Sequence, residues 1–256
     1  MNIRRYLSSA LVITELELRK IRHDQSQIWL RVVQPVLWLT VFGVTFSKIR
    51  SIPTGDFTYL QFMTPGILAQ SVIFVAIFYG LTIVWERDSG ILKKLLATPA
   101  PRYATVIGRS MASGVRAVFQ GLVVIPIALI IGVSFVTNPL YFIAAFLIIF
   151  FASGGFAALS IIIASFMKNR ETFMGIGQAI ILPLFFASNA LYPTEIMPSV
   201  LRHIVTYNPL SYMVDAVRSL IITGDLHQLP IDILAIGVFD ALMFGIAALT
   251  FKRIIE

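Results

Sequence analysis

The sequence predicts an all-α integral membrane protein, and two features of its composition lead to that fold class. Hydrophobic residues make up 57% of the 256 residues and charged residues only 13%, whereas soluble domains average about 45–50% and about 25%. Three long stretches, 57–85, 117–167 and 172–194, contain no charged residue. A helix needs about 20 apolar residues to cross the hydrocarbon core of a bilayer. These stretches are long enough to do so, and a soluble globular or disordered chain is excluded.

Six membrane-spanning helices are expected in a single transmembrane domain, residues 28–256. The spans are predicted over 28–46, 59–84, 117–136, 140–167, 172–191 and 231–251. An even number of spans puts both termini on one side. All of the 20 Lys and Arg residues except Lys48, Arg50, Arg202 and Arg218 fall on that side. The positive-inside rule therefore places both termini in the cytoplasm. The net charge of +7 lies beside the membrane, which argues against nucleic acid as a partner.

Residues 1–27 are predicted to form a cytoplasmic amphipathic helix beside the first span. The apolar face contains Leu7, Ala10, Leu11, Thr14, Leu18 and Ile21, at helical spacing. Glu15 and Arg19 on the other face can pair at i, i+4. The apolar run after Arg5 is too short for a signal peptide. The helix is either a basic anchor in the membrane interface or a docking surface for a partner.

Residues 192–230, between the last two predicted spans, are expected to form short outer helices. The first runs from 198 to 206. Asn208 and Pro209 are typical of the N-cap and first position of a second helix. Within it Asp215 and Arg218 can pair at i, i+3, and Gly224 is a suitable stop. Both helices are too short to span the membrane, so they are expected to lie on or dip into the outer leaflet.

Residues 85–102 form a cytoplasmic loop, here called the coupling loop, that begins with the charged residues Glu86 and Arg87. A short helix is predicted there, and Pro99 ends it. Its apolar stripe consists of Ile91, Leu92, Leu95 and Leu96. A rigid helix tied directly to a span can transmit force to a soluble partner. Alternatively, it lies in the lipid interface like other amphipathic helices.

The sequence offers no catalytic or metal-binding constellation, so an enzyme is not expected. It contains no cysteine, no phosphate-binding loop and only three isolated histidines. Several polar residues are expected inside the membrane. Hydrogen bonds between helices explain most residues such as Gln70, Gln120, Gln178 and Asn189. Asp240 lies near the middle of the last span, where an ionised carboxylate is costly, so it is expected to be protonated or paired with a polar side chain.

The order of several motifs resembles that of permease subunits of type-2 ABC transporters. The coupling loop reads Glu86-Arg87, then Gly90, an apolar pair and Thr98-Pro99. Pro65-Gly66 opens the second span, and Gly108-Arg109 precedes the third. The outer loop carries Tyr192-Pro193, Pro198, Asn208-Pro209, Tyr212, Asp215 and Arg218. Within the family, the chain looks most like drug-resistance permeases of the daunorubicin-exporter kind.

The resemblance implies a multi-pass permease in the cytoplasmic membrane of a prokaryote. Two separate ABC ATPase subunits would bind ATP and Mg²⁺, so this chain would carry no cofactor. A second permease copy or a related chain would complete the dimer, within membrane lipids. The N-terminal helix and the coupling loop would contact the ATPases, and spans two and five would line the path.

The implied cargo is hydrophobic or amphiphilic, either drug-like or lipid. One alternative is export of a lipid-linked oligosaccharide or polysaccharide by the same fold. Another is an ion-coupled secondary transporter, which would need ion ligands near the midplane and usually an internal repeat. The sequence offers Asp240 but no repeat.

Overall fold

A computed structural model describes residues 11–12, 14–15, 19, 26–49, 52–90, 102–167 and 169–251, and in these ranges the regular structure is entirely helical. Most of the predicted N-terminal helix and residues 91–101 of the coupling loop lie outside the described residues. The elements are α2 (Ser26–Leu37), the π-helical η1 (Trp38–Gly43), α3 (Val44–Ile49), α4 (Tyr59–Asp88), α6 (Arg102–Ile131), α7 (Pro139–Phe166), α8 (Arg170–Phe186), the 3₁₀ turn η2 (Thr194–Ile196), α9 (Ser199–Tyr207), α10 (Pro209–Arg218), the π-helical η3 (Ser219–Thr223) and α11 (Leu229–Thr250).

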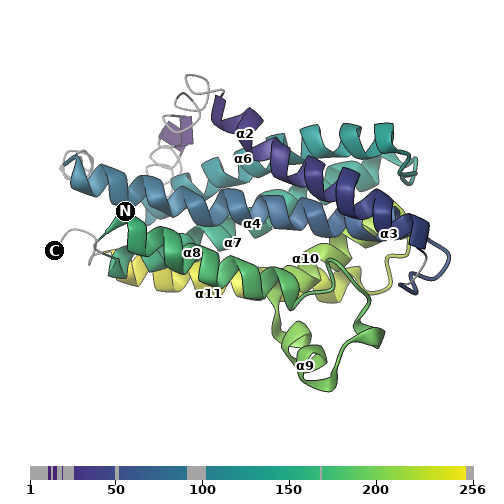
Figure 1. The fold of residues 1–256 in the computed structure, drawn as a ribbon. Coiled ribbons are helices and arrows are strands. Elements are labelled where there is room, and N and C mark those ends of the chain that lie inside the picture. Colours follow the sequence, from purple (N-terminus) through teal and green to yellow (C-terminus); the bar gives the residue numbers. More distant parts are fainter. Residues whose placement is uncertain are drawn as a thin grey trace.

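The long helices run side by side as a bundle, and successive ones alternate in direction (Figure 1). Helices α4, α6, α7 and α11 are long and apolar enough to cross a membrane, which confirms four of the six predicted spans by length and composition. The first predicted span is a continuous helical run of α2, η1 and α3, of which the apolar part is 32–48. The fifth, α8, has 17 residues. The six-span arrangement stays a prediction for these two.

Helix α4 lies at the centre of the bundle and packs against α6, α7, α8 and α10. Its start is fixed by a capping box, in which the Thr58 hydroxyl and the Gln61 side chain bond each other's backbone N–H groups. Gly66 follows Pro65 in the first turns of α4. A Cβ atom at Gly66 would lie 2.3 Å from the backbone oxygen of Ala190. Only glycine therefore allows this close contact between α4 and the chain leaving α8.

Two predicted helix boundaries are wrong. The third span was expected over 117–136, but α6 begins at Arg102 and ends at Ile131. Its charged first half stays helical because Arg109 and Arg116 find partners on α4, Glu86 and the Tyr79 ring. Beyond α6 the chain is no longer helical, and the Val136 N–H donates to the Ile221 carbonyl over 2.9 Å.

The fifth span was expected to reach residue 191, but α8 ends at Phe186. Past that point local hydrogen bonds replace the helical ones. The Ser188 hydroxyl donates to the Phe185 carbonyl over 2.6 Å, and the Tyr192 hydroxyl donates to the Phe186 carbonyl over 2.6 Å. The apolar run of the sequence continues through this turn, which is why hydrophobicity alone overestimates the helix.

Candidate functional site

The end of the bundle where α4 stops at Asp88, here called the inner end, carries a group of charged side chains. Glu86 in the last turn of α4 forms a buried ion pair with Arg109 of α6. Removing one partner of such a pair costs about 3–5 kcal/mol, because the other charge is left uncompensated in a poorly solvated place. Residues 85–88, expected at the start of the coupling loop, are the last turn of α4, so the pair joins α4 to α6 inside that turn.

Two further contacts fix the last turn of α4 to the next pair of helices. Arg87 donates from Nη1 to the carbonyl of Met167, directly after α7, over 2.7 Å. Asp88 accepts from Nε of Arg170, the first residue of α8, over 3.1 Å. The Arg170 guanidinium also lies 4.4 Å from the centre of the Trp85 ring, an attractive cation–π arrangement.

The charged side chains of this end are here called the inner cluster, which consists of Glu86, Arg87, Asp88, Arg109 and Arg170. They connect α4 to α6, to the end of α7 and to the start of α8. Helix α4 then ends, and Gly90 has a left-handed backbone with φ 72°. Of the predicted coupling residues, Ile91, Leu92, Leu95, Leu96 and Pro99 lie outside the described residues. The last turn of α4 is held to α6, to the end of α7 and to the start of α8.

The N-terminal segment also contacts the inner end. The Thr14 side chain is buried and its hydroxyl donates to the Gly108 carbonyl, the residue before Arg109, over 3.1 Å. The predicted ion pair between Glu15 and Arg19 is confirmed, at 2.8 Å. Leu11, expected on the same apolar face as Thr14, is 56% exposed. This part of the segment therefore packs on α6 through Thr14.

A second polar group, here called the outer cluster, lies at the opposite end of α4 and consists of Phe62, Asn189, Asp215 and Arg218. The predicted pair within α10 is confirmed, since Arg218 donates from Nη1 to Asp215 Oδ1 over 2.7 Å. Arg218 also donates from Nη2 to the Asn189 carbonyl over 2.8 Å, and its guanidinium lies 4.1 Å from the centre of the Phe62 ring. Asn189 in turn donates to Asp215 Oδ2.

Burial dominates the electrostatics of the outer cluster. It raises the pKa of the Asp215 carboxyl above its usual range, although Arg218 and the Asn189 amide act in the opposite direction. It lowers the pKa of Arg218, against the attraction of Asp215. Sequence spacing predicted the Asp215–Arg218 pair but not the third member. Asn189 was expected to bond between helices, and no local pattern indicates that its partner lies on α10.

The other residues predicted in the outer segment shape the corner between α9 and α10. Asn208 caps α10 as predicted, because its Oδ1 accepts from the Leu210 N–H over 3.0 Å. Its Nδ2 donates to the Leu184 and Ala187 carbonyls, both over 2.7 Å, and so holds the corner to the end of α8. The Tyr212 hydroxyl donates back to Thr206 over 2.6 Å. Pro198 directly precedes α9, Pro209 is the first residue of α10 and Gly224 follows η3, as the sequence predicts. Pro193 directly precedes η2.

The expectation that both outer helices lie on or dip into the outer leaflet stays a prediction, but the apolar face of α10 packs against protein. Leu210, Met213, Val214 and Val217 are all buried, and the buried run continues through η3. Helix α10 packs against α4, α7 and α11, within the outer end of the bundle (Figure 1). Helix α9 is different, since Val200 is 70% and Tyr207 85% exposed. The apolar face of α10 therefore serves the interior of the protein.

The remaining predicted polar residues do not join either cluster. Asp240 of α11 is buried against α7, and a Cβ at Gly155 would lie 1.8 Å from its Oδ1. That oxygen has no hydrogen-bond partner among the residues described. The expected pairing with a polar side chain is therefore not seen for this oxygen among the described residues. Gln70 of α4 is buried and lines a cavity between α2, α4 and α6.

The antiparallel bundle of apolar helices, with an ion-paired cluster of charged side chains at each of its two ends, is typical of a polytopic membrane protein. Comparison with known protein families leads to the same class. The family described as ABC-2 type transporter matches residues 9–222, and this chain belongs to that family.

Individual relatives are similar over most of their length. The chain is 28% identical over 242 residues to the ycf38 protein of Cyanophora paradoxa, covering 88% of this chain and 81% of that one. It is 26% identical over 203 residues to the daunorubicin resistance ABC transporter permease protein DrrB1 of Streptomyces coeruleorubidus, covering 78% and 70%. It is 25% identical over 206 residues to the inner membrane transport permease YadH of Escherichia coli K12, covering 77% of each.

Proposed function

We propose that the chain is the permease subunit of an ATP-driven exporter that moves a hydrophobic or amphiphilic compound out across the cytoplasmic membrane. Family membership supports the transport role. The names of two relatives, a daunorubicin resistance permease and an inner membrane transport permease, favour a drug-like or lipid cargo and this membrane. ATP and Mg²⁺ would bind to two partner ATPase subunits, and a second permease chain would complete the complex.

One observation carries the mechanism, namely the position of the inner cluster. The described helix α4 ends at Asp88, two residues after Glu86, and this last turn is held to α6, to the end of α7 and to α8 by charged contacts. A displacement of the loop by an ATPase would therefore move these helices together rather than bend the end of α4. In this proposal the inner end faces the cytoplasm, and the apolar stripe of the loop fits a groove on the ATPase.

The proposed contact with the ATPase is tested by the double variant Leu95→Ala with Leu96→Ala. Buried anchors of an interface typically cost about 2 kcal/mol or more when truncated, which corresponds to roughly a 30-fold loss of affinity. Co-purification with the ATPase in mild detergent measures this loss. Leu226→Ala, at a partly exposed outer position, is the control and should retain the ATPase. Wild-type retention by the double variant would reject the coupling role and favour a loop that lies in the lipid interface.

A further inference from the structure

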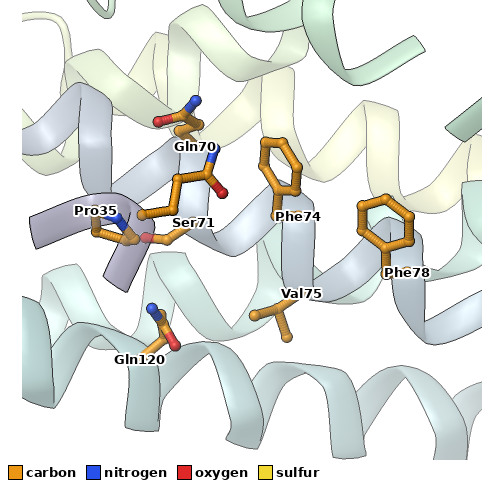
Figure 2. A pocket seen from close by; sticks show the side chains of 8 residues that line it. Pro35, Gln70, Ser71, Phe74, Val75, Phe78 and Gln120 are labelled. Atoms are coloured by element: carbon orange, nitrogen blue, oxygen red, sulfur yellow. The ribbon is translucent and has the colours of Figure 1, made fainter. Parts of the chain in front are cut away.

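A cavity of about 270 Å³ lies between α2, α4 and α6. Its polar lining includes the side chains of Gln34 of α2, Gln70 of α4 and Gln120 of α6. Figure 2 shows Gln70 and Gln120 on facing helices, with Phe74 and Phe78 further along α4. None of the lining residues comes from α8. The cavity is therefore separate from a path between spans two and five.

The lining divides into a polar and an aromatic part. Gln70, Phe74 and Phe78 follow each other at intervals of four residues, so they lie on one face of α4. The two phenylalanine rings stack with their centres 5.8 Å apart. At 1.5 Å per residue, the amide of Gln70 and the ring of Phe78 are about 12 Å apart along the helix. The cavity thus offers hydrogen bonds at one end and an apolar wall at the other.

The amide of Gln70 points to a ligand. The residue is 3% exposed and its side chain lines the cavity, and no hydrogen bond joins its amide to another residue of the described ranges. A polar group that faces the interior of a membrane protein without a partner costs free energy, and no lipid tail can supply one. Ser71 beside it has already satisfied its hydroxyl with the Ile67 and Leu68 carbonyls of its own helix, at 2.9 and 2.8 Å. The free amide is available to something that enters the cavity.

The chemistry of the lining restricts that ligand. Among the residues that the structure describes, no charged side chain lines the cavity, so these residues offer an ionised group no counter-charge in the membrane. Ligand cavities usually measure about 300–1,000 Å³, so this volume suits one ring or head group rather than a whole drug-sized molecule. Gln70 also lies well inside α4, 11 residues after its first residue and 18 before its last, so a head group bound there would be away from both ends of the helix.

We propose that this cavity binds the uncharged, hydrogen-bonding head group of an amphiphile, such as a sugar or an amide, with its apolar part against Phe74 and Phe78. If the proposed function holds, the head group belongs to a cargo molecule that is crossing the membrane, and this assignment rests on that function. A tightly held neutral lipid presents the same chemistry. The Gln70 amide donates to and accepts from the head group in either case.

The test uses the full chain in phosphatidylcholine nanodiscs, without ATP or ATPase, so that it does not depend on the proposed transport. The probe is dodecyl glucoside with a photoactivatable diazirine on the sugar, compared with dodecyl phosphate carrying the same group. We expect Gln70→Leu to raise the half-saturating concentration about fivefold, the effect of about one lost hydrogen bond. Ser71→Phe fills the cavity without removing a contact between helices, and should abolish most of the labelling.

Gln178→Leu is the matched control, because Gln178 is exposed on α8 and outside the cavity. Thermal unfolding of each variant shows whether it is folded, and either folded variant suffices. Equal labelling of Gln70→Leu, Ser71→Phe and the control would overturn the proposal, as would equal labelling by the phosphate.

The two sources are separated by two further measurements. If the head group belongs to cargo, the complex with its ATPase moves dodecyl glucoside across vesicles, and Gln70→Leu slows that movement. If it belongs to a held lipid, solvent extraction of the purified chain releases a neutral lipid that the Ser71→Phe protein lacks. Both results support the site. Failure of the ATPase to bind or to drive movement would count against the proposed function alone, because the labelling experiment contains neither ATP nor ATPase.

Discussion

The inner and outer clusters are built from the same chemistry, a buried arginine with an acidic partner, but they connect different parts of the chain. At the inner end Arg109 and Glu86 lie on two long helices, 23 residues apart in sequence. At the outer end Arg218 and Asp215 are three residues apart in one short helix. The inner pair can therefore carry a displacement from α4 to α6, whereas the outer pair fixes the shape of one inserted segment.

The surroundings of the two pairs sharpen this contrast. The outer cluster is completed by Asn189 and by the close approach of Gly66 to Ala190, which are contacts that hold a fixed turn in place. The inner cluster is completed by Arg87 and Arg170, which attach α4 to the chain around the α7–α8 junction. The outer contacts hold one turn in place, and the inner contacts join several helices. This difference is consistent with the proposal that an ATPase acts on the inner end.

The largest expected effect is a difference in thiol labelling between the inner and the outer end of the bundle. Single cysteines at Thr98 and Asn169 should be shielded from an impermeant thiol reagent in intact cells, and cysteines at Thr54 and Ser199 should be labelled. The chain contains no native cysteine, so the signal has no background. Labelling at Thr98 would place the inner cluster outside the cell and overturn both the six-span topology and the contrast between the ends.

The next effect tests whether the outer cluster is structural. Asp215→Ala removes the acidic partner of the Arg218 guanidinium, and losing this charge-assisted hydrogen bond should lower the free energy of unfolding by about 1.5–3 kcal/mol. Denaturation in detergent measures it. Asp56→Ala, at an exposed outer position, is the control. Equal stability of the two variants would remove the structural role assigned to the outer pair.

A smaller effect is expected at the contact between α4 and the chain leaving α8. Gly66→Ala places a Cβ against the Ala190 backbone, and overpacking of this kind typically costs about 1–3 kcal/mol. Gly237→Ala in α11, where a Cβ meets nothing within 4 Å, is the matched control. If Gly66→Ala is as stable as Gly237→Ala, the close approach is not a constraint on the fold.

Sequence reasoning succeeded where the signal is local. Helices α7 and α11 begin and end within two residues of their predicted bounds, because prolines and polar residues limit their apolar runs. The cap at Asn208 was predicted for the same reason.

Contacts between distant segments could not be predicted. The pairing of Glu86 with Arg109 and of Asn189 with Asp215 depends on how the bundle brings separate helices together. The buried face of α10 has the pattern of any amphipathic helix, so its periodicity cannot distinguish lipid from protein as its partner.

We propose that the inner cluster passes movement of the coupling loop to the spans. Glu86→Gln keeps the size of the side chain and one acceptor, but weakens a charge-assisted bond to Arg109. The measurement is cargo transported per ATP hydrolysed by the complex in vesicles, with Glu171→Gln at an exposed position on α8 as control. We predict unchanged ATPase binding and a transport ratio at least about fivefold lower, equivalent to about 1 kcal/mol. A ratio equal to that of the control would contradict the account.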